Sequence, residues 1–182
     1  MRRSICWGRV FLFWMLPAGL LAESVQVTVK TVAANTSFIS LDTDVQSSQQ
    51  TLWTLLTDYN HQAQFLPYIS KSQIVGKEGS DFLVDQEGTI RILLWSFTLR
   101  MKQRVTDDPP RNMHFRTVEG DFKRLEGDFH LESGHAPSWT HLSCQFTVEP
   151  KRRVPEWAVR MAARMYLRKM VRVLAEKAEG RR

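Results

Sequence analysis

Residues 93–105 alternate regularly between apolar and polar side chains. Successive residues of a β-strand point to opposite sides, so the apolar side chains of this stretch share one face and the polar ones share the other. The pattern predicts an antiparallel strand with one buried face and one face in water. Its apolar face consists of Leu93, Trp95, Phe97, Leu99, Met101 and Val105.

Shorter alternating runs fill the rest of residues 68–150. They are separated by turn signals, among them residues 76–80 (GKEGS) and 107–110 (DDPP). We therefore expect about six antiparallel strands in this part of the chain. Residues 36–45 predict one further strand before them, which makes a sheet of about seven. A β-prone run at residues 25–29 precedes that strand, and its pattern does not decide whether it joins the sheet.

Helical periodicity appears on both sides of the six strands. After residue 45 the chain predicts two short helices. One begins at Ser47 or Ser48 as N-cap, and the other is a helical turn within residues 61–67 that a proline stops. A long helix is predicted from Pro155, a favoured first position, to about Glu179. Its apolar stripe consists of Val159, Ala163, Tyr166, Met170, Val173 and Leu174.

Strands in series with flanking helices are typical of an α+β fold. A strongly curved antiparallel sheet that wraps around the long C-terminal helix would bury both apolar faces against each other. We find no linker or low-complexity tract after residue 22, so we expect a single domain at residues 23–182 with its core at 36–178.

The first 22 residues have the pattern of a secretory signal peptide. Three arginines precede a continuous apolar run at residues 10–16, which is too short to be a comfortable membrane anchor. We expect cleavage near Ala22 and a periplasmic or secreted protein; an uncleaved membrane tether is the alternative. Cleavage would remove Cys6 and leave Cys144 as a single cysteine in an apolar strand pattern, where we expect it to be buried and inert.

Charge is distributed unevenly along the chain. Residues 23–150 carry eleven Lys and Arg against sixteen Asp and Glu, a net charge of −5. Residues 151–182 carry eleven against three, a net charge of +8. The basic character of the protein therefore belongs to its C-terminal segment.

Residues 118–129 (VEGDFKRLEGDF) contain one tetrapeptide, Glu-Gly-Asp-Phe, twice. Four acids at this spacing raise the question of an acid/base or metal site. Residues seven apart face opposite sides of a regular strand, so Phe122 and Phe129 would share a face only if a β-bulge lay between them. We interpret the repeat as a bent strand with two core aromatics and solvated acids, and we place the bulge at Gly120 or Gly127. The scattered histidines offer no metal-ligand spacing, so we expect no metal site.

Two segments resemble the polyketide cyclase/dehydrase-like, coenzyme Q-binding START-type family. They are residues 52–75 (LWTLLTDYNHQAQFLPYISKSQIV) and 111–129 (RNMHFRTVEGDFKRLEGDF). The resemblance implies a helix-grip fold, with a hydrophobic cavity between the sheet and the C-terminal helix. Members of this family bind lipids, quinones, polyketides or other apolar molecules, and some are cyclases.

The resemblance and the alternation together predict the walls of that cavity. A fully packed core is the alternative for these same side chains. The predicted ligand-binding residues are Trp95, Phe97, Leu99, Met101, Met113, Phe115, Phe122, Leu142, Phe146, Tyr166 and Met170.

The predicted C-terminal helix also carries a basic stripe. Arginines recur every four residues, with Trp157 and two methionines among them, which suits the surface of an anionic membrane. A solvated face that pairs with the acids of the sheet is the alternative. The residues predicted to face a membrane are Trp157, Arg160, Arg164, Arg168 and Arg172.

These observations favour an exported, non-enzymatic protein that binds an apolar small molecule, lipid-like or quinone-like, without a cofactor and without nucleic acid. A cyclase or dehydrase that uses the same cavity is the second hypothesis. Its candidate polar groups are Tyr166, Cys144 and His114, although the alternation places His114 on the wet face. A protein-interaction module that docks through the basic helix is the third.

Overall fold

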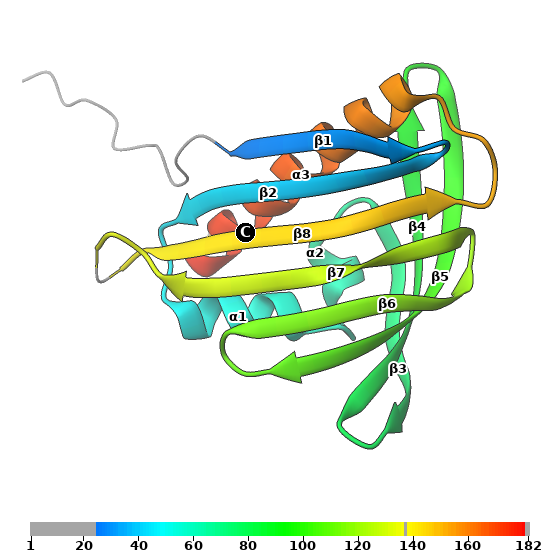
Figure 1. Cartoon of the computed structure of the whole chain (residues 1–182). Helices are drawn as coiled ribbons and strands as arrows, with labels where there is room; N and C mark the ends of the chain where they lie inside the picture. The colour runs from blue at the N-terminus through cyan, green and yellow to red at the C-terminus, as the bar shows by residue number, and fades with distance from the viewer. Residues whose placement is uncertain (1–24, 137, 181–182) are drawn as a thin grey trace, which may run out of the picture.

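The computed structural model describes residues 25–136 and 138–180, so the predicted signal peptide lies outside the described residues. In the described part, eight strands form one antiparallel sheet in the order β1-β2-β8-β7-β6-β5-β4-β3 (Figure 1). The strands are β1 (Gln26–Ala33), β2 (Thr36–Val45), β3 (Ile69–Glu78), β4 (Asp81–Ile92), β5 (Trp95–Asp108), β6 (Asn112–Gly120), β7 (Phe122–Ser133) and β8 (Thr140–Pro150).

Helices α1 (Gln49–Thr57), α2 (Gln62–Phe65) and α3 (Glu156–Ala178) lie on one side of the curved sheet (Figure 1). The predicted cap of α1 is confirmed at Ser48, whose Oγ accepts a hydrogen bond of 3.1 Å from the backbone N–H of Thr51. The long helix runs across the concave face, which confirms the α+β helix-grip architecture expected from the sequence.

The core lies between the concave face of the sheet and the helices. Leu41, Leu131 and Leu142 from three neighbouring strands are fully buried, together with Leu52 of α1 and Leu174 of α3. Complete burial of one such side chain stabilises the fold by about 1.5–3 kcal/mol. The apolar stripes of sheet and helix therefore account for the arrangement of the two layers.

The run at residues 25–29 does join the sheet. It lies in β1, which pairs with β2 at one edge and buries Val29 against Ile39. The sheet therefore has eight strands where the sequence predicted about seven. The six strands predicted within residues 68–150 are confirmed as β3 to β8.

One boundary of the strand predicted at residues 93–105 is wrong. Strand β4 ends at Ile92 and β5 begins at Trp95, so Leu93 and Leu94 form the tight turn between them. Leu93 has a φ of 54°, a left-handed conformation that Asn and Gly usually provide in such turns. The alternation could not reveal this turn because Leu93 keeps the apolar phase of the strand that follows.

The first copy of the Glu-Gly-Asp-Phe repeat spans the junction of β6 and β7, and the second lies within β7. Gly120 ends β6, and Phe122 begins β7 after a one-residue turn. The predicted bulge is confirmed, but the register shift falls between Phe122 and Arg124, without a glycine. It brings Phe122 and Phe129 onto the same concave face, where both pack against the core.

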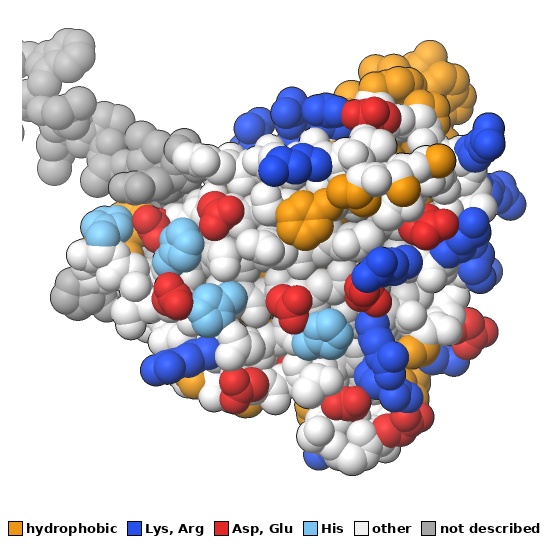
Figure 2. All heavy atoms as spheres, viewed as in Figure 1, with side chains coloured by type: hydrophobic (Ala, Val, Ile, Leu, Met, Phe, Trp, Pro, Cys, Tyr) orange, Lys and Arg blue, Asp and Glu red, His pale blue; other side chains and the backbone are white. Residues whose placement is uncertain are grey.

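The four acids of the repeat point away from the core and bind partners separately. Glu119 pairs with Lys102 at 2.9 Å, and this hydrogen bond raises the pKa of the Lys102 ammonium. Asp121 accepts a hydrogen bond of 2.8 Å from the backbone N–H of Arg100. Figure 2 shows acids interspersed with histidines over this outer face. The remaining two pairs are Glu126 with Arg124 and Asp128 with His114. Within the described residues, no group of acids, histidines and cysteines could hold a metal ion.

Candidate apolar ligand site

The predicted ligand-binding residues lie along the concave face at increasing exposure toward the tip of the β4–β5 hairpin. The buried ones are Met113, Phe115, Leu142 and Met170. The half-buried ones are Leu99, Met101, Phe122, Phe146 and Tyr166. Trp95 and Phe97, at the end of the row, are 58% and 50% exposed.

Register explains why these side chains form one continuous face. Across β4 and β5, Trp95 lies opposite Ile92, Phe97 opposite Ile90 and Met101 opposite Gln86. Directly paired residues of antiparallel strands point to the same side. The face of Ile92 and Gln86 is the buried one, so Trp95 and Phe97 belong to the concave side, although little covers them.

The deeper end of the face is packed. The ring of Phe115 lies 5.8 Å from that of Phe129 and 6.2 Å from that of Phe146. Gly127 stands opposite both Phe115 and Phe146, and a Cβ there would lie 2.3 Å from the Cβ of Phe146. The glycine therefore allows the aromatic cluster to close. For Phe115, the alternative of a packed core describes the structure.

Tyr166 of α3 attaches this helix to the open end of the concave face. Its hydroxyl accepts a hydrogen bond of 2.6 Å from the backbone N–H of Arg91. Its ring packs edge-on against the ring of Tyr68, with the two ring centroids 5.3 Å apart. Burial raises the pKa of Tyr68 well above its usual range. Tyr68 is therefore a neutral part of the wall.

The three polar candidates for catalysis do not converge. Cys144 is buried on the concave side of β8, and burial raises the pKa of its thiol well above its usual range. His114 is on the outer face of β6, where its Nδ1 lies 2.8 Å from Oδ1 of Asp128. A thiol on one side of a sheet and an imidazole on the other cannot act on one substrate atom.

Two buried polar groups were missed by the sequence reasoning. Gln86 donates hydrogen bonds to Oε1 of Gln62 at 2.7 Å and to Oγ of Ser72 at 3.1 Å, while Gln62 donates to the carbonyl of Leu56 at 2.9 Å. This network attaches α2 to the edge of the sheet. A signal was present: Gln86 occupies an apolar phase of its strand, between Val84 and Gly88.

The second missed group is the pair of Tyr59 and Asp107. The tyrosine hydroxyl donates to Oδ1 of Asp107 at 2.9 Å and lies 3.0 Å from Sδ of Met113. Burial, with the Asp107 charge beside it, raises the pKa of Tyr59 well above its usual range. Burial also raises the pKa of Asp107, and the hydrogen bond from Tyr59 partly opposes this.

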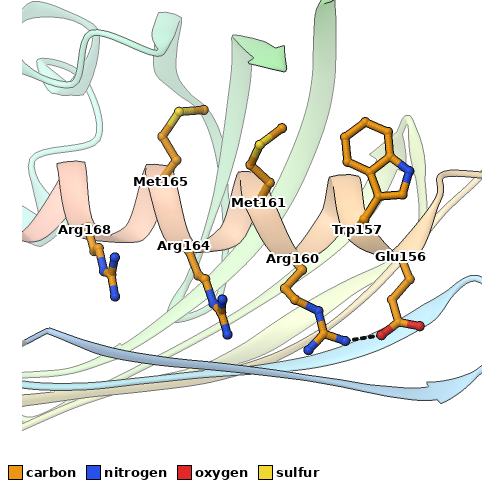
Figure 3. A pocket seen from close by; sticks show the side chains of 7 residues that line it. All are labelled: Glu156, Trp157, Arg160, Met161, Arg164, Met165 and Arg168. Atoms are coloured by element: carbon orange, nitrogen blue, oxygen red, sulfur yellow. Dashed lines mark hydrogen bonds and ion pairs between the residues drawn. The ribbon is translucent and has the colours of Figure 1, made fainter. Parts of the chain in front are cut away.

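A hollow of about 630 Å³ follows the solvent side of α3 (Figure 3). In this view its arginines leave the helix on the side of the β1 ribbon, and its apolar side chains leave on the opposite side. The lining residues are Glu156, Trp157, Arg160, Met161, Arg164, Met165 and Arg168.

A second hollow, of about 330 Å³, lies between the start of α1 and the β7–β8 loop and includes Gln49, His135 and Trp139. Neither of these two hollows lies between the sheet and α3. The cavity expected there, and the ligand role of the residues above, stay predictions.

The profile of the family described as polyketide cyclase/dehydrase and lipid transport matches residues 45–175, most of the chain. The chain belongs to this family. The match confirms the family resemblance drawn from residues 52–75 and 111–129. The curated proteins contain no significant match to the chain.

Solved structures of the START-like superfamily share the fold of this polyketide cyclase/dehydrase family member. The Zhui aromatase/cyclase from a Streptomyces strain is 14% identical, with a TM-score of 0.67 over 79% of this chain and 94% of that one. A START superfamily protein from Mycobacterium smegmatis is 20% identical, with a TM-score of 0.67 over 79% and 97%. A STAR-related lipid transfer protein from Xanthomonas axonopodis is 10% identical, with a TM-score of 0.59 over 84% and 98%. At these identities the likeness shows the fold.

Proposed function

We propose that this protein is a non-enzymatic carrier that holds a lipid-like or quinone-like molecule on the concave face of its sheet, against α3. One observation carries the proposal. The apolar concave face of β5 continues past the part that the core covers, from half-buried Leu99 and Met101 to exposed Phe97 and Trp95. An apolar ligand on this face would remove that surface from water, which is the main source of affinity for such ligands.

The neutrality of this part of the face also favours a carrier. From Trp95 to Val105, the side chains of β5 that point to the concave side carry no charge, and the facing residues of β4 from Val84 to Ile92 carry none. A charged group there would lose its hydration when an apolar ligand bound. The nearest carboxyl on this side of β5, Asp107, is engaged by Tyr59.

A cyclase or dehydrase is the second candidate, because the family includes such enzymes. It requires an acid or base within hydrogen-bond reach of the substrate. The described residues place Cys144 in the core, His114 outside it and the Tyr166 hydroxyl in a bond with the backbone of β4. These contacts favour binding over chemistry.

Export belongs to the proposal and rests on the pattern of residues 1–22. Intact-mass measurement of the protein recovered from its own cells tests it. We expect a chain that begins at residue 23 and is found outside the cytoplasm. A full-length chain in the cytoplasm would contradict export and leave the binding proposal standing.

Titration with a neutral apolar fluorophore, N-phenyl-1-naphthylamine, tests the binding site. Leu99 points to the concave face and its neighbour Thr98 to the outer face, so Leu99→Glu and Thr98→Glu form a matched pair. We expect Leu99→Glu to weaken binding roughly tenfold or more, because it places a charge in an apolar site. We expect Thr98→Glu to bind like the unmodified protein. Leu99→Trp, which fills space without adding charge, should also lower the affinity. Equal affinity in all four proteins would overturn the proposal.

A further inference from the structure

We propose that the tip of the β4–β5 hairpin and the solvent side of α3 together form a docking surface for a bilayer that contains anionic lipids. This inference goes beyond the proposed function, since a carrier needs no membrane contact in order to bind its ligand. It also assigns a role to Leu93 and Leu94, which fall within the half-buried strand predicted at residues 93–105, with Leu93 on its buried face.

The hairpin tip presents apolar side chains to water at a convex end of the molecule. Leu94 is 99% exposed and Leu93 is 74% exposed, and Trp95 and Phe97 follow them on the same hairpin. A tight turn ordinarily carries Asn or Gly, and here it carries two leucines. Figure 2 shows an apolar cap at the corner where Figure 1 places this tip. Contiguous exposed apolar surface of this kind marks an interaction site.

The hairpin tip and α3 are fixed beside each other. The hydrogen bond from the backbone N–H of Arg91 to the hydroxyl of Tyr166 attaches the end of β4 to the middle of the helix. In Figure 1 the first turns of α3 lie toward the same corner of the molecule as the tip of the β4–β5 hairpin, and Trp157 and Met165 of this helix are exposed. This arrangement suits a bilayer: the leucines at the tip would enter the acyl region, and the tryptophan near the tip would lie at the headgroup level, which aromatic side chains favour.

The arginines of α3 provide the matching charge. Arg164 and Arg168 are exposed and line the hollow along the helix, and within the described residues neither forms an ion pair. Arg160 pairs with Glu156 of the same helix, so the alternative of pairing with the acids of the sheet is not what the described residues show. Exposed guanidinium groups without an ion pair bind phosphate oxygens through charge-assisted hydrogen bonds.

Charge complementarity favours a lipid surface over a second copy of this protein. Residues 151–182 carry a net charge of +8, so two copies facing each other through α3 would repel. An anionic bilayer satisfies the arginines through its phosphates and the leucines through its acyl chains in one contact.

The test measures binding of the full chain to sedimenting vesicles of equal parts phosphatidylcholine and phosphatidylglycerol, and to vesicles of phosphatidylcholine alone. Leu94→Glu should weaken binding to the anionic vesicles roughly tenfold or more, because it removes an inserting side chain and adds a negative charge. Arg164→Gln should weaken it roughly fivefold, the contribution of one basic residue near a charged surface. Val75→Glu is the matched control, since Val75 is also exposed and lies toward the opposite end of the sheet edge.

Peptide-resolved hydrogen exchange on the same samples reports vesicle contact at the hairpin tip itself, separately from any contact that residues 1–22 make. We expect anionic vesicles to protect the peptide that spans residues 90–98 and to leave the β3 peptide unchanged. The inference is overturned if residues 90–98 exchange equally with and without vesicles, or if Leu94→Glu and Val75→Glu bind alike. Protection of the tip by a second copy of the protein instead of by lipid would also overturn it. Leu94→Glu and Arg164→Gln should both keep the affinity of the unmodified protein for the fluorophore. Failure of the membrane inference is therefore distinguishable from failure of the carrier proposal.

Discussion

The hydroxyl of Tyr59, in the segment between α1 and α2, donates a hydrogen bond of 2.9 Å to Oδ1 of Asp107 near the end of β5. This bond joins the helical segment to the sheet across the buried end of the concave face. We expect Tyr59→Phe to lower the free energy of unfolding by about 1–3 kcal/mol, because it leaves a partly buried carboxylate without its donor. Urea unfolding measures the change, and an unchanged unfolding midpoint would contradict the role of this bond.

Asp107 makes stability depend on pH in a defined direction. Burial raises its pKa in the folded protein, so its contribution is fully present below the pKa of the unfolded chain and is lost as pH rises through the folded value. Asp107→Asn keeps an acceptor for Tyr59 and removes the ionisation. We therefore expect Asp107→Asn to gain stability relative to the unmodified protein at pH 7 and to match it at about pH 3, below the unfolded value. Urea unfolding at the two pH values tests this, and a gain that is larger at acid pH would contradict it.

Gly127 is required because residues of the neighbouring strand β8 lie too close to it for a side chain to fit. A Cβ at this position would lie 2.1 Å from the carbonyl oxygen of Gln145 and 2.3 Å from the Cβ of Phe146. We expect Gly127→Ala to destabilise the fold by about 1–3 kcal/mol through overpacking. Gly76→Ala is the control: its Cβ would lie 3.4 Å from Leu83, and we expect a change within about 0.5 kcal/mol. Thermal unfolding distinguishes them, and equal effects would show that the close approach at Gly127 relaxes freely.

The buried amide network should be sensitive at Gln86. Gln86→Leu leaves Oε1 of Gln62 with the 3.5 Å contact from Ser72 alone, so we expect a loss of about 1–3 kcal/mol. Gln103→Leu on the neighbouring strand makes the same change where, among the described residues, the amide has only a 3.5 Å contact to Sδ of Met101. It should cost less, and chemical denaturation of both variants measures the difference. A larger loss at Gln103 would contradict the importance of the network.

Cys144 should not react while the protein is folded. It is 1% exposed, and burial raises the pKa of its thiol. In a Cys6→Ser background we expect a thiol reagent to modify Cys144 only at the rate of unfolding. Rapid modification of the folded protein, followed by loss of fluorophore binding, would place the thiol in the ligand site and revive the enzyme hypothesis.

Most of the fold could be predicted because its signals are periodic. The stripe of Ala163, Met170 and Leu174 faces the core as the helical period requires. The phase of Phe122 and Phe129 required a bulge, and one is present. Its position could not be predicted, because a register shift depends on the pairing of two distant strands.

The site was predicted less completely, because its boundaries depend on tertiary contacts. Alternation placed Trp95 and Phe97 on the correct face, but their exposure depends on how far the helices cover that face, which no local pattern records. The turn at Leu93 and Leu94 was missed because both residues are apolar and so resemble a strand. The partner of Tyr59 is 48 residues away in the chain, and sequence spacing alone could not identify it.

Native mass spectrometry of the protein purified from its own cells tests the carrier proposal most directly. We expect a species heavier than the chain by one small molecule, which an organic solvent extracts as a lipid or quinone and which the Leu99→Glu variant lacks. A chain of unmodified mass that also fails to bind the apolar fluorophore would contradict it.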